Sequence, residues 1–487
     1  MKTGFERLGR VEFAQSILLI AVLLGFGGVA QAENPQNPMT WNGITLYGTL
    51  DLGVSYQSHG RPPGDYYSAG AYTFPNKAST DATSQVGDNG LSQSSLGLRG
   101  NLGFADGWTG LFKAESALNP VSLTLTDNEK SLIQNNGKPI TSQRAGTDSS
   151  LTGKFSMGLY AGVKSNDFGQ LTYGRQNTPL KEAFYRYDPL ANSAAFSAFG
   201  AYGTPAGGGS TENARLNNAV RYQLDIGRVR AEALYAGRTR SQGGAAWQID
   251  LGTKLQGLSL EGVVAQKKQA IVAASLAYPS ATSAISVTQL TTIPVKAGYG
   301  YAPSGSIAVD DALVGTVSDN RAWAVFARYD FDGPALYGGF ERITYANPSS
   351  PLAAGLDSIG GYHFAIVNNG AYTTDKMLSV KWIGVKYPVA QKLDVMAAAY
   401  GLDQNSWTGN ACAVPGAKSP GTTIPVTTTS PCSSGSQRTL SLAGVYKVNS
   451  FFDFYIGIMA SHLSGGNASG FVHPSVYNAM TGVRMNF

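Results

Sequence analysis

Charged side chains recur at alternate positions of short, otherwise apolar segments of this chain. In one such segment Arg230 and Glu232 share a face, and Val229, Ala233 and Tyr235 occupy the other. Seven further charges take the polar phase of similar segments: Asp51, Arg99, Lys113, Glu115, Lys164, Arg215 and Arg221. Two acids, Glu182 and Asp188, lie in a connection between segments. Fixed charges in such rows act on passing ions through their field.

Histidines and cysteines are too few and too scattered to build a metal or cofactor site. The four histidines are His59, His363, His462 and His473, and the two cysteines are Cys412 and Cys432. Both cysteines fall in the connection 403–436, and a secreted setting favours a disulfide over two free thiols. Such a loop stabilises the chain by roughly 3 kcal/mol in the chain-entropy model.

The elements that carry the charges have the period of a β-strand. In Trp247–Leu255 the odd positions are apolar or Thr and the even positions are polar or Gly. Successive strand residues point to opposite faces, so each segment has one apolar and one polar face. The apolar faces carry aromatic residues near the segment ends, which is typical of outer-membrane barrels, whereas a soluble sandwich packs its large residues at mid-strand.

Composition agrees with a membrane barrel and excludes several other classes. Of 487 residues 14% are charged, 43% are hydrophobic and 60 are glycine; a soluble protein has roughly 25% charged residues. A net charge of +5 is too small for a nucleic-acid-binding protein, and the hydrophobic content argues against disorder. A mean hydropathy of −0.10 argues against a bundle of membrane helices.

Residues 1–32 have the pattern of a removable signal peptide. Lys2, Arg7 and Arg10 precede an apolar core of about a dozen residues, and Ala30-Gln31-Ala32 has the form of a cleavage site. An uncleaved membrane anchor is the alternative, but the apolar core is too short to span a bilayer. We therefore expect residues 33–487 to form one barrel domain with no membrane helix.

About 16 strands are predicted, joined alternately by short turns and long links. They lie near 44–56, 94–102, 107–118, 157–167, 169–176, 215–226, 228–237, 246–256, 257–267, 320–331, 334–346, 376–387, 391–402, 437–447, 451–462 and 477–487. An all-β, transmembrane, antiparallel barrel with an even number of strands requires this alternation. Residues 268–319 are long for a loop, and an extra strand pair there would give 18 strands; we retain 16.

Five segments in order resemble the general porins of Gram-negative bacteria, especially those of β-proteobacteria. They are Ile44–Asp51, Leu96–Gly100, Asp167–Gln176, Arg215–Tyr222 and Thr481–Phe487. The resemblance covers most of the chain except the central long loop and the 403–436 loop. It implies a homotrimer of 16-stranded barrels in the outer membrane, among membrane lipid and lipopolysaccharide. It also implies biogenesis through periplasmic chaperones and the barrel-assembly machinery, which reads the terminal Phe487.

Each barrel would be a water-filled pore narrowed by residues 177–214, folded inward as a constriction loop. Small hydrophilic solutes and ions would cross by passive diffusion. The family's ladder of wall arginines falls on Ser95, Met157 and Arg215, so two of its three members are missing. Because the seven wall charges are five basic and two acidic, we expect a mild preference for anions.

Three other functions are compatible with parts of the sequence. A substrate-specific channel for a sugar, an amino acid or an organic anion would use the aromatic-rich 177–214 loop as its binding site. A lipid hydrolase would need a Ser–His pair, and His462 has no visible acid partner, so no enzyme activity is expected. Surface recognition through the long Ser/Thr/Gly-rich loops is compatible with a pore.

Overall fold

The computed structural model describes most of the chain beyond its first segment. The described residues are 39–59, 81–121, 124–126, 155–202, 214–238, 243–275, 299–301, 313–352, 364–412, 414, 417 and 424–487. The predicted signal peptide, 1–32, lies outside these residues, as do 203–213 of the predicted constriction loop.

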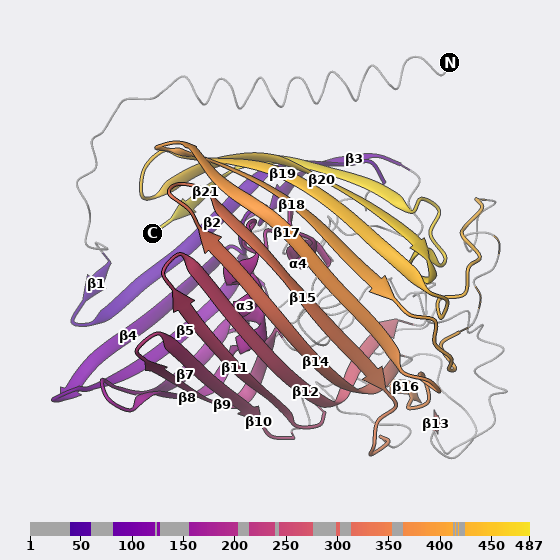
Figure 1. The fold of residues 1–487 in the computed structure, drawn as a ribbon, viewed down its shortest axis with the longest axis horizontal. Helices are drawn as coiled ribbons and strands as arrows, with labels where there is room; N and C mark the ends of the chain where they lie inside the picture. Colours follow the sequence, from indigo (N-terminus) through magenta and orange to yellow (C-terminus); the bar gives the residue numbers. More distant parts are fainter. Residues whose placement is uncertain are drawn as a thin grey trace.

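Sixteen antiparallel strands form a closed barrel in the described part of the chain (Figure 1). They are β2 (Ile44–Gln57), β4 (Ser95–Ala105), β5 (Trp108–Asn119), β7 (Gly158–Ser165), β8 (Gly169–Asn177), β9 (Arg215–Ile226), β10 (Val229–Ala236), β11 (Ala246–Leu255), β12 (Leu258–Ser275), β14 (Leu313–Asp330), β15 (Ala335–Ala346), β17 (Lys376–Ala390), β18 (Leu393–Gln404), β19 (Gly435–Lys447), β20 (Phe452–Gly465) and β21 (Ser475–Asn486). This confirms the predicted fold class.

The ring closes between its first and last strands. β2 pairs with β21 from Thr49↔Asn486 to Gln57↔Asn478. Beyond the last pair, Gly48 and Phe487 exchange two backbone hydrogen bonds, of 2.9 and 3.0 Å. Closure leaves no free sheet edge, which a strand structure in lipid requires.

The alternation predicted from the sequence is present on both faces of the strands. On β11, Trp247, Ile249 and Leu251 are exposed on the outside, whereas Gln248 and Asp250 are buried on the inside. The outside therefore offers apolar side chains to lipid, and the inside is mainly polar.

The link between β12 and β14 adds no strand to the ring, because these two strands pair directly. Both are longer than predicted: β12 continues to Ser275 instead of ending near 267, and β14 begins at Leu313 instead of near 320. The pairing of the two strands continues past the predicted ends, through a register shift between Lys267 and Ala270, as far as Ser275↔Leu313. Residues 276–298 and 302–312 of this link lie outside the described residues.

Five short strands and three helices complete the described elements. They are β1 (Thr40–Trp41), β3 (Thr83–Asp88), β6 (Thr124–Thr126), β13 (Tyr299–Tyr301), β16 (Phe364–Asn368), α3 (Pro179–Tyr187), α4 (Ala198–Tyr202) and the 3-10 helix η5 (Gly466–Ala468). β3 was not predicted; it pairs with β2. β13 pairs with β16.

Short turns join the strands at one end of the barrel and long connections join them at the other. Gly107, Gly169 and Gly227 have positive φ angles in the short turns, a conformation that glycine adopts without a steric penalty. Cys412 and Cys432 form a disulfide in the link between β18 and β19, with 5.2 Å between their Cα atoms. The predicted pairing of the two cysteines is thus confirmed.

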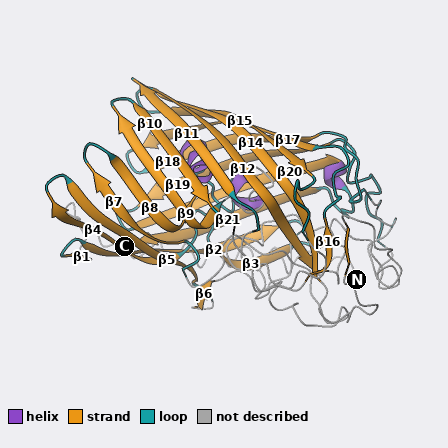
Figure 2. Ribbon diagram, turned by 90° about the horizontal axis from the view of Figure 1, so that it is seen from below, coloured by secondary structure: helices purple, strands orange, loops and turns teal. Residues whose placement is uncertain are grey.

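The connection between β8 and β9 folds into the barrel. Figures 1 and 2 show α3 and α4 enclosed by the ring of strands. Thr178 caps α3 by accepting a hydrogen bond from the Lys181 amide at 3.3 Å, and Pro179 occupies the first turn.

Candidate functional site

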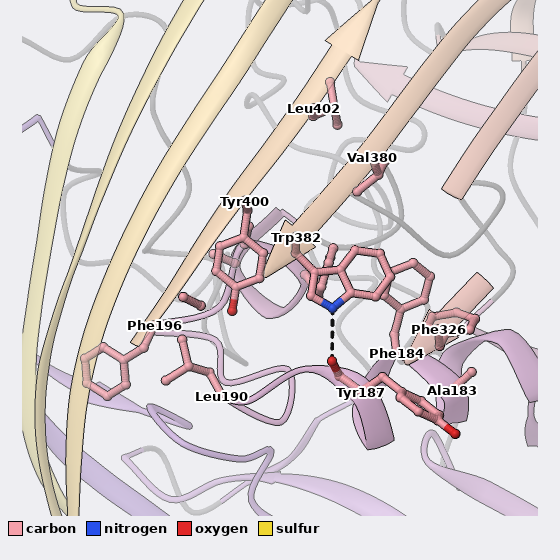
Figure 3. Packing of buried hydrophobic residues seen from close by; sticks show 14 of the residues in the cluster. Ala183, Phe184, Tyr187, Leu190, Phe196, Phe326, Val380, Trp382, Tyr400 and Leu402 are labelled. Atoms are coloured by element: carbon pink, nitrogen blue, oxygen red, sulfur yellow. Dashed lines mark hydrogen bonds between the residues drawn. The ribbon is translucent and has the colours of Figure 1, made fainter. Parts of the chain in front are cut away.

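The apolar face of α3 packs on one part of the inner wall. Leu180, Ala183, Phe184 and Tyr187 are buried on this face. Their partners on the wall include Phe326 of β14 and Trp382 of β17, while Phe196 continues the cluster beyond the helix (Figure 3). Phe199 belongs to the same cluster. The wall on this side is therefore covered by the loop.

Phe184 lies at the centre of an aromatic group. Its ring centroid lies 4.6 Å from that of Phe199, 5.1 Å from that of Trp382 and 5.2 Å from that of Phe326. The Trp382 indole donates a hydrogen bond to the Tyr187 carbonyl at 3.0 Å, so the ring also fixes the end of α3 (Figure 3). Aromatic pairs of this kind hold a loop firmly in place.

Asp188, at the end of α3, is buried and serves as an anchor. Its carboxylate accepts a hydrogen bond from the Tyr400 hydroxyl at 2.6 Å and from the amides of Leu190 (3.2 Å) and Asn192 (2.8 Å). Burial raises the pKa of this carboxyl, and the hydrogen bond from Tyr400 offsets part of the increase. Asp188 is thus a structural group rather than a solvated loop charge.

The polar face of α3 joins the adjoining part of the wall, from β9 to β12, through a network of ion pairs. Arg221 of β9 binds Glu182 at 2.6 Å and Glu232 of β10 at 2.5 Å. Arg186 binds Glu261 of β12 and lies 3.4 Å from Asp250 of β11. Arg230 of β10 binds both Asp250 and Glu261, at 2.8 Å each.

Charge within this network is nearly balanced, because three arginines face four carboxylates. Burial alone would raise the pKa of Glu182, but the hydrogen bonds from Arg221 hold it below its usual value. The carboxylate therefore stays ionised and bound to the wall. The three arginines, being paired, contribute little net field to the lumen.

A second group of charges, beside β4 and β5, is predominantly basic. Lys113 binds Glu115 at 2.5 Å, and Arg99 lies over the Tyr47 ring, 5.0 Å from its centroid. Lys181 of α3 faces this group. Burial lowers the pKa of its amine, and the nearby charge of Arg215 lowers it further. Within the described ranges, neither Arg99 nor Lys181 has a carboxylate within 4.0 Å.

The remaining predicted site residues occupy three different environments. Arg215 is buried, and its Nε donates to the Met157 carbonyl at 3.3 Å. Asp51 is fully buried and accepts hydrogen bonds from the Tyr455 hydroxyl (2.6 Å) and from the Leu91 amide (2.8 Å). Lys164 is exposed near the short-turn end of β7. The structure therefore brings Arg99, Lys113 and Glu115 together, and separately Arg221 and Glu182.

Several members of the two groups were not predicted as site residues, although the sequence analysis had already placed Arg230 and Glu232 on one polar face. Arg186, Arg230, Glu232, Asp250 and Glu261 complete the ion-pair network, and Lys181 joins the basic group. The strand members have the same polar phase as the residues that were predicted, so alternation contained the signal. Nothing in the loop sequence distinguishes Lys181 from its neighbours. In the described part of the chain, no group of three His, Cys, Asp or Glu side chains is arranged to hold a metal ion.

A closed barrel with lipid-facing apolar side chains, a polar interior and an inward-folded loop defines the class of outer-membrane channels. Residues 19–466 match the family model described as Gram-negative porin, and the chain belongs to that family. It is thus an outer-membrane channel for passive diffusion.

Solved structures with the same fold share little sequence with this chain. One is an anion-selective porin from Comamonas acidovorans, with 16% identity and a TM-score of 0.54, covering 91% of this chain and 99% of that one. Another is OmpT of Vibrio cholerae with its loop L8 deleted, with 14% identity and a TM-score of 0.53, again covering 91% and 99%. No curated protein matches the chain.

Proposed function

We propose that this porin is a general diffusion pore with a mild preference for anions, narrowed by residues 177–214. The observation that carries the proposal is the contrast between the two charge groups. The arginines beside β9–β12 are paired with acids, whereas Arg99 and Lys181 are not. Since the loop covers the wall from β12 to β20, solutes would pass along the basic side. Fixed cations in a confined channel attract anions.

Reversal potentials in a KCl gradient across planar bilayers test this selectivity. Lys181→Glu should shift the anion-to-cation permeability ratio toward cations by several-fold, because it places an acid instead of a base on the loop that is proposed to narrow the pore. Lys392→Glu makes the same change at an exposed turn outside the lumen and should leave the ratio nearly unchanged. Equal ratios in Lys181→Glu and the wild type would refute the site assignment.

Arg215→Glu should have a smaller effect on permeation than Lys181→Glu, because Arg215 is buried.

A substrate-specific channel remains the alternative. Such a channel would bind its substrate on the aromatic side chains of the loop. However, four of these side chains are buried where the loop packs on the wall: Phe184, Tyr187, Phe196 and Phe199. This burial favours the general pore. Single-channel recordings with added sugars, amino acids or organic anions discriminate the two: saturable block by one class of solute would favour a specific site.

The trimer is a proposal that the outer surface supports. Leu96, Leu98, Phe104, Leu159 and Tyr173 are exposed on neighbouring strands from β4 to β8, and they form an apolar face suitable for subunit contacts. Chemical cross-linking of the detergent-solubilised protein tests the trimer.

The signal peptide is tested by the mass of the mature protein, which should begin at Glu33. Chaperones and the assembly machinery remain expected partners in biogenesis.

One contact makes an enzyme assay worthwhile. The His462 Nδ1 lies 2.8 Å from the Ser475 hydroxyl, on the outside of the barrel. In the described part of the chain no carboxylate is hydrogen-bonded to the other ring nitrogen, so the pair lacks the third group that orients a catalytic base. We therefore propose a channel without hydrolase activity. Phospholipase activity that is abolished by Ser475→Ala would overturn this.

A further inference from the structure

Lys376 is the first residue of β17 and lies on the inner face of the barrel, on the side of the long connections. It has the same phase along the strand as Leu378, Val380 and Trp382, which are buried on that face. The exposed apolar side chains on the outer face of β17 begin only at Ile383. Because the long connections of such barrels face the outside of the cell, Lys376 lies at the outer mouth of the pore, beyond the lipid-facing band.

Three aromatic side chains gather beside the Lys376 amine, and we call them the aromatic box: Tyr345 of β15, Tyr372 between β16 and β17, and Trp407 between β18 and β19. The Nζ atom of the lysine lies 5.7 Å from the ring centroid of Tyr345 and 5.8 Å from that of Trp407. The Tyr372 centroid lies 6.1 Å from that of Tyr345 and 5.1 Å from that of Trp407, so the three rings form one group. Tyr345 and Trp407 are buried.

Hydrogen bonds between the two links hold the aromatic box together. The Thr408 amide donates to the Thr374 hydroxyl at 2.8 Å. The Met377 amide donates to the side-chain oxygen of Asn405 at 2.7 Å. These contacts flank the lysine on one segment and Trp407 on the other. The backbone therefore fixes the position of the amine relative to the rings.

The Lys376 amine has no polar partner but is open to solvent. In the described part of the chain no carboxylate lies within 4.0 Å of its Nζ, and this atom makes no hydrogen bond. Lys381 and Lys386 of the same strand, in contrast, bind Asp403 and Asp394. Lys376 keeps part of its side-chain surface exposed, and its Nζ is not a buried atom. A small solute in the pore mouth can thus reach it.

These surroundings favour the neutral amine. Burial among the rings lowers the pKa of Lys376 from 10.5 to about 8. The titratable groups that face it, Tyr345 and Tyr372, are neutral phenols whose pKa values burial raises. The ring faces stabilise the ammonium by only about 0.5–1 kcal/mol, which corresponds to less than one pKa unit. At neutral pH the neutral share of this amine is therefore roughly ten-fold or more above that of a hydrated lysine.

We propose that Lys376 is a site of covalent modification by aldehydes, including the open-chain form of reducing sugars. A desolvated lysine amine is a nucleophile toward carbonyl carbon. The nitrogen adds to the aldehyde carbon, and loss of one water, which carries away the aldehyde oxygen and both amine protons, leaves a C=N bond. No oxidant or reductant is needed. The imine becomes a cation when it is protonated, and the faces of Tyr345 and Trp407 stabilise that cation as they do the ammonium.

Reductive trapping on the purified porin in detergent tests the proposal, with glyceraldehyde as the aldehyde, cyanoborohydride as the trap and peptide mass mapping as the readout. At neutral pH, Lys376 should be labelled roughly ten-fold faster than Lys392, which lies in an exposed turn. Trp407→Ala should admit water to the amine, lower its labelling about five-fold and raise the pH of half-maximal labelling. The matched control, Tyr345→Phe, keeps every ring of the aromatic box and should be labelled like the wild type.

Two outcomes would overturn the proposal: labelling of Lys376 no faster than that of Lys392, or an unchanged rate and pH profile in Trp407→Ala. If Trp407→Ala does not fold, Tyr345→Ala replaces it with the same expectation. Lys376→Arg should lose the adduct at this position and keep the labelling of Lys392. The inference does not rest on the proposed anion preference, which Lys181→Glu tests separately.

Discussion

At the scale of single residues, surroundings rather than residue type decide what each charge does. Arg221 and Arg99 both come from the polar phase of a strand. Arg221 is bound between Glu182 and Glu232, whereas Arg99 lies over the Tyr47 ring and has no carboxylate within 4.0 Å among the described residues. Of these two arginines, Arg99 is therefore the one that we expect to act on ions in the lumen. The polar phase of each residue could be predicted from the sequence, but its partners could not, since they come from strands far apart in the chain.

Asp188 provides a pH-dependent test at this scale. Burial raises the pKa of Asp188 in the folded protein above its value in the unfolded chain, which is about 3.9. The folded state therefore gains stability from protonated Asp188. This gain is complete below the unfolded-state pKa and is lost as the pH rises through the folded-state pKa. We expect the unfolding temperature of the detergent-solubilised porin to fall over that range. Asp188→Asn should remove this part of the pH dependence, and Asp332→Asn, in an exposed turn, should retain it. An unchanged pH profile in Asp188→Asn would contradict the assignment.

At the scale of elements, α3 is held by two different kinds of contact on its two faces. Aromatic packing fixes one face and ion pairs fix the other, so the loop is fastened to the wall on both sides of the helix. The capping residue Thr178 and the following Pro179 are recognisable in the sequence as a helix start. Which strands the helix contacts depends on how the barrel closes around it.

Phe184→Ala tests the aromatic contact. Removing a buried phenyl ring costs roughly 3–5 kcal/mol, and the loss should fall on the docking of the loop rather than on the strand ladder. We expect noisier and larger single-channel currents. Tyr185→Ala, on the exposed face of the same helix, is the control and should conduct like the wild type. If the currents of Phe184→Ala are as quiet as those of the wild type, the Phe184 side chain does not hold the loop.

The disulfide in the link between β18 and β19 stabilises that link and not the strands of the ring. Its closed loop stabilises by roughly 3 kcal/mol in the chain-entropy model, and no strand of the ring lies inside it. Cys412→Ser/Cys432→Ser should therefore make the 405–434 segment sensitive to protease in intact cells, while conductance and oligomer stay unchanged. A loss of conductance would mean that the link also shapes the pore.

At the scale of the whole molecule, closure of the ring is the decisive contact. The last residue, Phe487, exchanges backbone hydrogen bonds with Gly48, and its ring packs close to the Gly48 backbone, where a larger residue would clash. The first and last strands of the ring, β2 and β21, are thus joined in the finished barrel.

Deleting Phe487 should lower the fraction of folded barrel in cells, because the closing contact is lost and because the proposed recognition of this residue by the assembly machinery would be lost as well. Heat-modifiable migration in gels measures the folded fraction. Refolding of the same variant into detergent, without the machinery, separates the two causes: normal refolding there would assign the defect to recognition, and poor refolding would assign it to closure.

Sequence alone determined the strand period, the 16 strands, the alternation of short and long links and the paired cysteines, because these depend on neighbours close in the chain. It did not determine the lengths of β12 and β14, the burial of Asp51, Asp188 and Arg215, or the pairing of the lumen arginines. Those features depend on contacts across the barrel, which exist only once the ring has closed.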